Sequence, residues 1–207
     1  MEGTGNSQRS RNRASVEKEQ QEPDVEITEN LTRADKIEDF MKDLMPKDLW
    51  SGVYARNLFP IEDFVTKRDT CCILNLDDYD EPGSHFVAVA KNGKYIFVYD
   101  SFASTVPYNM LEPFLSEFCK KNRYLLWKNP TQHQSYASNA CAYFCIWFLF
   151  EFTKVYPSVT LKNVKKWITS HLKKTKTKVN EKRIINGICD YISEHVAEIK
   201  ENHLDKM

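Results

Sequence analysis

The chain has 207 residues, of which 42% are hydrophobic and 13% are aromatic. This length and composition suit one globular domain with its own core and exclude two large domains. The 29 basic residues balance the 29 acidic ones, so the net charge favours no class of partner.

The N-terminal sequence and the cysteines bear on the compartment. The first 20 residues are polar, which predicts that no secretory signal is present and that the protein is not secreted. No spacing among the six cysteines matches a zinc site. We therefore expect free thiols in a reducing compartment. The apolar run at 140–150 is shorter than the about 20 residues of a membrane span, so we expect a buried helix and no membrane partner.

Hydrophobic periodicity divides the chain into an arm and one domain. Residues 1–31 lack aromatic side chains and periodicity, which predicts a disordered N-terminal arm. The domain, 32–207, should begin with a helix over 37–44. Strands are expected at 71–76, 85–90, 95–99 and 124–127, and further helices at 108–119, 140–154, 161–174 and 181–200. The sequence therefore predicts an α+β fold, a small mixed sheet flanked by helices.

Two of the predicted strands place a histidine beside a carboxylate. His85 begins one strand, Asp100 ends the next, and Asn92-Gly93 between them is a strong hairpin signal. Seven residues lead from His85 to Asn92 and seven from Gly93 to Asp100, so the register predicts that His85 lies opposite Asp100. A carboxylate on the far nitrogen of an imidazole fixes its tautomer and stabilises the imidazolium.

A cysteine stands where a helix start would activate it. Cys141 lies in the first turn of the apolar helix, after Ser138 and Asn139, either of which is a good N-cap. The helix dipole and free amides there favour a thiolate. Taken singly, Cys141 also fits a buried core cysteine and Asp100 a plain strand end. Their combination with His85 indicates a nucleophile with its base and orienting acid.

Three strings of residues resemble a known family. They are Gly83-Ser-His85-Phe-Val-Ala-Val-Ala, then Tyr99-Asp100-Ser-Phe, then Gln134-Ser-Tyr-Ala-Ser-Asn-Ala-Cys141. The set resembles adenain, the family of adenovirus maturation proteases, within the wider group of cysteine proteases that deconjugate ubiquitin-like proteins. The similarity extends from about residue 48 through the Cys141 helix.

This resemblance assigns a role to each polar residue. It implies that His85 is the base, Asp100 the orienting acid and Cys141 the nucleophile, at the N-terminus of a buried central helix. The side-chain amide of Gln134 would donate to the oxyanion, together with the backbone N–H of Cys141.

Three positions differ from patterns within this group. Phe86 stands where Trp is usual, and Ala142 follows the nucleophile where Gly is usual. The acid is Asp100, as in the deconjugating proteases, where adenain has Glu. None of these differences removes a catalytic atom.

The resemblance also implies a biological setting. We expect a monomeric cysteine endopeptidase that cleaves viral precursor polypeptides at glycine-containing sites during virion maturation. It would come from an adenovirus-like virus or a large self-synthesising DNA transposon. It would act in the virion and in the host nucleus or cytoplasm, without a metal or other cofactor.

Other functions remain open on the sequence alone. An isopeptidase would release a ubiquitin-like protein from a conjugate. An acyltransferase can use a similar His–acid–Cys order to move acetyl groups. A non-enzymatic, capsid-associated relative could retain the fold, although the intact residue set argues against this.

A basic segment near the C-terminus bears on DNA, which activates adenain. Between 162 and 183 there are nine Lys or Arg and one acid. A helix there would present a basic face suited to phosphates, formed by Lys162, Lys165, Lys166, Lys173 and Lys174. A solvated lysine-rich face fits equally well, and any binding should be independent of DNA sequence.

Overall fold

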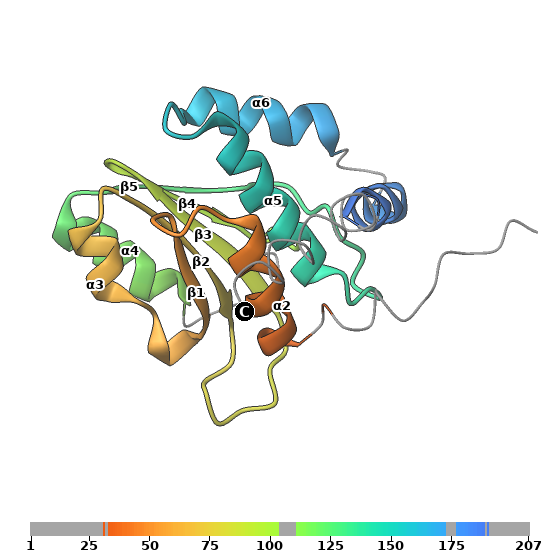
Figure 1. Ribbon diagram of the computed structural model, residues 1–207, viewed down its shortest axis with the longest axis horizontal. Helices are drawn as coiled ribbons and strands as arrows, with labels where there is room; N and C mark the ends of the chain where they lie inside the picture. The colour runs from red at the N-terminus through yellow and green to blue at the C-terminus, as the bar shows by residue number, and fades with distance from the viewer. Residues whose placement is uncertain (1–30, 32, 104–110, 173–176, 189, 191–207) are drawn as a thin grey trace, which may run out of the picture.

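The computed structural model describes residues 31, 33–103, 111–172, 177–188 and 190, so the expected arm, apart from Leu31, lies outside the described residues. Leu31 itself is buried in the core, with 5% of its surface exposed. The α+β prediction is confirmed: helices pack on both faces of a five-stranded mixed sheet, with strand order β1-β2-β3-β4-β5 (Figure 1).

The sheet combines parallel and antiparallel neighbours. Its strands are β1 (Trp50–Ala55), β2 (Asp69–Asn75), β3 (Phe86–Asn92), β4 (Tyr95–Tyr99) and β5 (Leu125–Lys128). The central pairs β2–β3 and β3–β4 are antiparallel, and the outer pairs β1–β2 and β4–β5 are parallel. The helices are α2 (Ala34–Leu44), α3 (Ile61–Thr66), α4 (Leu111–Asn122), α5 (Cys141–Val155) and α6 (Leu161–His171), with a 3-10 turn η1 (Arg56–Leu58) and a further helix over 177–188.

The strands bury both of their faces because side chains alternate along each strand. One face packs with α2, α5 and α6, and the other with α3 and α4 (Figure 1). The first face carries Cys71, Ile73, Ala88, Ala90, Phe97 and Tyr99. The second carries Cys72, Leu74, Val87, Val89, Ile96 and Val98. The sheet is therefore a rigid middle layer, which suits it to hold polar groups at its end.

Helix α5 is buried from Ala142 to Leu149 because the sheet, α2 and α6 cover it. Phe148 shows this position, since its ring stacks on Tyr99 of β4 at 4.9 Å and meets Trp167 of α6 edge-on at 6.0 Å. Within the described part of the chain, no helix combines the length and apolarity required to cross a membrane.

Sequence analysis missed three short elements and predicted one strand register wrongly. Strand β1, the 3-10 turn η1 and helix α3 were not predicted, because all three are short and none has a clean hydrophobic period. The hairpin pairs Asn92 with Tyr95, so its loop is Gly93-Lys94 and Asp100 lies two residues away from the predicted position opposite His85. A shift of two residues keeps both side chains on the same face, because side-chain direction repeats every two residues. The predicted register is wrong, but the predicted contact is preserved.

The central position of Phe148 leads to a stability prediction. We expect Phe148→Ala to lower the free energy of unfolding by about 3–5 kcal/mol, through lost burial and the cavity that it leaves. Urea denaturation followed by circular dichroism measures this. Leu125→Ala, at a side chain 50% exposed on β5, is the control and should change stability by about 0.5 kcal/mol or less. Similar losses for both variants would contradict the packing described.

Candidate active site

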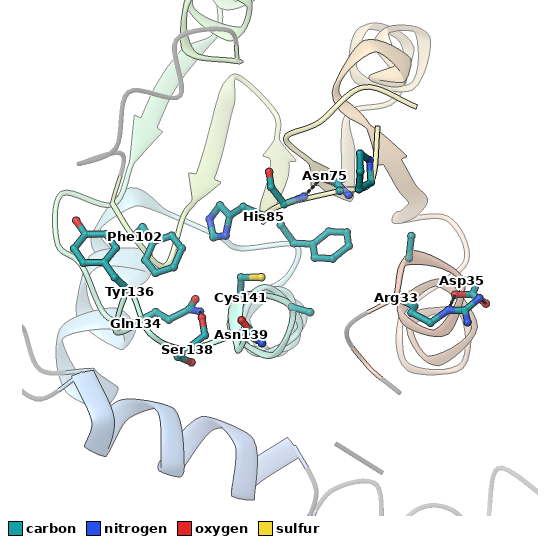
Figure 2. A pocket seen from close by; sticks show the side chains of 16 residues that line it. Arg33, Asp35, Asn75, His85, Phe102, Gln134, Tyr136, Ser138, Asn139 and Cys141 are labelled. Atoms are coloured by element: carbon teal, nitrogen blue, oxygen red, sulfur yellow. Dashed lines mark hydrogen bonds and ion pairs between the residues drawn. The ribbon is translucent and has the colours of Figure 1, made fainter. Parts of the chain in front are cut away.

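A cleft of about 600 Å³ opens at the end of the sheet where β3 begins and β4 ends. One wall comes from the β2–β3 loop and the start of α2, and the other from the segment that leads into α5 (Figure 2). Its lining includes His85, Phe86, Phe102, Gln134, Cys141 and Ala142. All four residues to which the sequence assigned chemistry therefore meet at one place, three in the lining and Asp100 directly behind His85.

His85 and Asp100 form a buried hydrogen-bonded pair. The distance from His85 Nε2 to Asp100 Oδ1 is 2.9 Å, and the two residues are 4% and 3% exposed. Burial lowers the pKa of His85, but the hydrogen bond to Asp100 and the interaction with Cys141 outweigh it and raise this pKa to about 9. The histidine therefore favours the imidazolium form at neutral pH.

Cys141 lies at the first position of α5, beside the His85 ring (Figure 2). Burial raises the pKa of its thiol, but the interaction with the neighbouring His85 outweighs this, so the pKa lies below the usual range of a thiol. The backbone N–H groups of Phe86 and Ala142 lower it further. Because Nε2 of His85 is held by Asp100, Nδ1 is the nitrogen that can exchange a proton with the sulfur. The arrangement supports a thiolate–imidazolium pair.

The helix cap differs from the sequence prediction. Ala140 is the N-cap of α5 and no side chain caps it, so neither Ser138 nor Asn139 has the predicted role. The Ser138 hydroxyl instead accepts from the backbone N–H of Ala140, at 3.2 Å. A side-chain cap would occupy amides of the first turn, whereas here the N–H of Ala142 acts on the Cys141 thiol.

Gln134 is fully buried and held at both ends of its amide. Its Oε1 accepts from the Ser101 hydroxyl at 2.5 Å, and its Nε2 donates to the Ser138 carbonyl at 2.7 Å. The backbone carbonyl of Ser101 also accepts from the N–H of Gln134 at 3.1 Å. An amide nitrogen has two N–H groups, and these bonds use one of them. Gln134 is therefore fixed at the cleft, and these bonds leave its second amide N–H able to donate.

Sequence analysis missed the residues that hold the acid. Asn129 brackets the backbone of Asp100: its Oδ1 accepts from the Asp100 N–H at 2.8 Å, and its Nδ2 donates to the Asp100 carbonyl at 2.7 Å. The N–H of Phe102 donates to Asp100 Oδ1, also at 2.8 Å. Ser101 then connects the acid to Gln134. The place of Ser101 directly after the acid was the only signal for it, and Asn129 gave none.

The C-terminal helix over 177–188 secures the segment that carries Gln134. Asn180 donates to the carbonyl of His133 at 3.3 Å, and Glu181 accepts from the N–H of Ser135 at 2.5 Å. His133 is in turn hydrogen-bonded to the hydroxyl of Tyr99, at 3.1 Å. Burial lowers the pKa of His133 to about 4, so this histidine is neutral and structural.

The expected DNA-binding lysines are only partly described. Lys162, Lys165 and Lys166 are exposed on α6, whose opposite face buries Val164 and Trp167. The other two predicted positions, Lys173 and Lys174, lie outside the described residues. Within the described ranges, no cluster of three or more His, Cys, Asp or Glu side chains is arranged to hold a metal ion.

A constrained loop leads into His85. Gly83 has a φ of +86°, and a Cβ added there would lie 2.4 Å from Asn75 Nδ2. Asn75 cannot give way freely, because its Oδ1 accepts from the N–H groups of Asp77 at 3.1 Å and Ser84 at 3.4 Å. The loop therefore needs glycine at position 83, both for its backbone and for space.

A scan against protein-family models found no match, and a search of curated proteins found no match either.

The Gly83 contact gives a paired prediction. We expect Gly83→Ala to lower the free energy of unfolding by about 2–3 kcal/mol, through the left-handed backbone and the clash with Asn75. It should also slow alkylation of Cys141 by iodoacetamide, located by peptide mass mapping, because the loop positions His85.

Gly93→Ala is the matched control. Gly93 has a φ of +53° but nothing within 4 Å of an added Cβ. It should lose only about 1 kcal/mol and leave the alkylation rate unchanged. Equal behaviour of the two variants would contradict the account of the loop.

Proposed function

We propose that the protein is a cysteine peptidase with Cys141 as nucleophile, His85 as general acid and base, and Asp100 as the residue that orients His85. The observation that carries this proposal is the buried 2.9 Å bond from His85 Nε2 to Asp100 Oδ1, at the same cleft as Cys141. A structural cysteine on an apolar helix needs no such partner. Cys145, one turn further on, is an example: it is fully buried and its thiol pKa is raised by burial.

The chemistry follows from these positions. The thiolate of Cys141 attacks the carbonyl carbon of the substrate, and the oxygen takes up the negative charge. Gln134 Nε2 and the backbone N–H of Cys141 stabilise this charge. The C–N bond then breaks as imidazolium His85 gives its proton to the leaving amine, and the acyl group remains on Cys141 as a thioester. Neutral His85 next takes a proton from water, which hydrolyses the thioester and regenerates the thiolate.

We place the protein with the adenain-like proteases as the finer part of this proposal. The order His85, Asp100, Gln134 and Cys141, with the nucleophile opening a buried helix, supports it. Substrates would then be viral precursor polypeptides cut at glycine-containing sites during virion maturation. The exposed Lys162, Lys165 and Lys166 on α6 support sequence-independent stimulation by DNA.

A cleavage assay tests the proposal. Peptides carrying Gly-Gly or Gly-X-Gly before the bond are incubated with the full chain, with and without plasmid DNA. We expect cleavage that Cys141→Ala abolishes and that Asp100→Asn lowers by about a hundredfold or more, because the histidine loses its orienting acid. The matched variant Cys145→Ala should retain activity.

Two further assays distinguish the other functions. Labelling of Cys141 by a ubiquitin-like probe ending in Gly-Gly, without cleavage of linear peptides, would favour an isopeptidase. Transfer of label from acetyl-coenzyme A to a protein would favour an acyltransferase. A folded protein that shows none of these activities, with or without DNA, would contradict the proposal.

A further inference from the structure

The segment that carries Gln134 is bound on both sides by polar side chains of the C-terminal helix. Asn180 Nδ2 donates to the carbonyl of His133 at 3.3 Å. Glu181 Oε1 accepts from the backbone N–H of Ser135 at 2.5 Å. These contacts join positions 47 and 46 residues apart in the chain. A distant element therefore holds the two neighbours of Gln134.

The two contacts complete a set that fixes both peptide planes beside Gln134. In the plane before it, the N–H of Gln134 donates to the carbonyl of Ser101 at 3.1 Å, and the carbonyl at the other end is the one that Asn180 holds. In the plane after it, the carbonyl of Gln134 accepts from Gln132 Nε2 at 2.8 Å, and the N–H at the other end is the one that Glu181 holds. A peptide unit is planar and rigid, so holding both planes fixes φ and ψ of the residue between them.

The backbone angles of Gln134 decide where its side-chain amide lies. Ser101 and Ser138 hold the end of this side chain, but they act on it from the position that the backbone provides. A donor that stabilises an oxyanion must lie roughly 2.7–3.1 Å from the developing charge. A misplacement of about 1 Å is enough to lower the rate about a hundredfold. Support of the backbone therefore bears directly on the reaction.

We propose that Glu181 is a positioning residue for the oxyanion site, which holds the backbone of Gln134 in place through the N–H of Ser135 and is assisted by Asn180. This role rests on the proposed peptidase function and deepens it. A carboxylate suits the task, because a hydrogen bond to an ionised acceptor is shorter and roughly twice as strong as a neutral one. The C-terminal helix is then part of the structure required for the reaction.

The core holds this helix in place independently of its polar contacts. Asn180, Ile184 and Ile188 are spaced four residues apart, so they share one face of the helix, and all three are buried. Both isoleucines belong to the same core cluster as α5. Asn186, in contrast, is exposed. Glu181 can therefore be replaced while the apolar contacts of the helix remain.

Kinetics of peptide cleavage by the full chain test the positioning role. We expect Glu181→Ala to lower kcat by about tenfold to a hundredfold and to change KM by about twofold or less, because the support matters to the charged transition state. Glu181→Gln keeps an acceptor oxygen and should retain kcat within about threefold. Glu181→Asp withdraws the acceptor by one methylene and should behave like Glu181→Ala. Comparison of the Gln and Asp variants repeats the test in chains that keep a polar side chain.

Two probes of Cys141 give a readout that needs no cleavage. A peptide aldehyde forms a hemithioacetal with the thiolate, and the oxygen of this adduct takes the place of the oxyanion. Iodoacetamide alkylates the same sulfur by displacement of iodide and forms no oxyanion. We expect Glu181→Ala to weaken binding of the aldehyde by about tenfold to a hundredfold. The alkylation rate should stay within about twofold, because the thiolate itself is unaffected.

Ile184→Val is the matched control, because it loosens the packing of the same helix and keeps both polar contacts. It should leave kcat and aldehyde binding within about twofold, and the exposed Asn186→Ala should change neither. Unchanged aldehyde binding in Glu181→Ala would overturn the inference, as would an equal loss in Ile184→Val. A parallel loss of alkylation would also overturn it, since Glu181 would then act on the thiolate.

The failure of this inference is distinguishable from the failure of the peptidase proposal. Cleavage that survives Cys141→Ala would contradict the peptidase proposal, and the inference with it. Cleavage that Cys141→Ala abolishes and Glu181→Ala leaves unchanged would contradict the inference alone.

Discussion

The buried bond between His85 and Asp100 is the interaction on which the site depends. Moving a carboxylate out of water is costly unless it is paired and hydrogen-bonded, and breaking such a pair costs several kcal/mol, roughly 3–5. Two donors to the carboxylate of Asp100 meet this cost, Nε2 of His85 and the N–H of Phe102, while Asn129 holds the backbone of Asp100. A cation is then stabilised next to the sulfur of Cys141. The charges of the site, a cation on His85 and a thiolate on Cys141, therefore depend on one carboxylate at the end of β4.

The rest of the fold serves to keep that carboxylate, the histidine and the cysteine in register. The central strands are buried on both faces, so their ends cannot move independently of the core. Helix α5 is buried from Ala142 to Leu149 and presents its first turn to the cleft. The segment carrying Gln134 is fastened by Ser101 on one side and by the helix over 177–188 on the other. Rigid supports of this kind reduce the reorganisation that a charged transition state would otherwise require.

Much of this was accessible from the sequence because strong local signals carried it. The apolar strand before the hairpin signal Asn92-Gly93 and the uniformly apolar run after Ala140 predicted the hairpin and α5, and with them the meeting of His85, Asp100 and Cys141. Elements without such a signal were missed, as with the six-residue helix α3 and the six-residue strand β1. Supporting contacts were missed for a different reason. Asn129 and Glu181 act across long stretches of chain, and no local pattern indicates which distant backbone group a polar side chain will meet.

The hairpin shows how a wrong register can leave a right contact. The predicted turn at Asn92-Gly93 was shifted by one residue along the chain, which moved the pairing by two. A shift of one in the pairing would have turned Asp100 to the opposite face of the sheet, away from His85. Because the shift in pairing is even, His85 and Asp100 remain on the same face of the sheet. They are diagonal neighbours across the hairpin, and the long side chain of histidine reaches the carboxylate. Contact predictions from hairpins are therefore more robust to even shifts than to odd ones.

Titration of the Cys141 thiolate tests the central claim most directly. The ultraviolet absorbance of the thiolate is followed with pH, as the difference between a chain with Cys141 and the same chain with Cys141→Ala. This difference is measured once with Asp100 present and once with Asp100→Asn. The account predicts a thiolate that forms below the usual thiol pKa of about 8.5 and that forms only at higher pH once Asp100 is neutralised. A Cys141 that titrates at or above the usual value, and does so equally in both backgrounds, would contradict it.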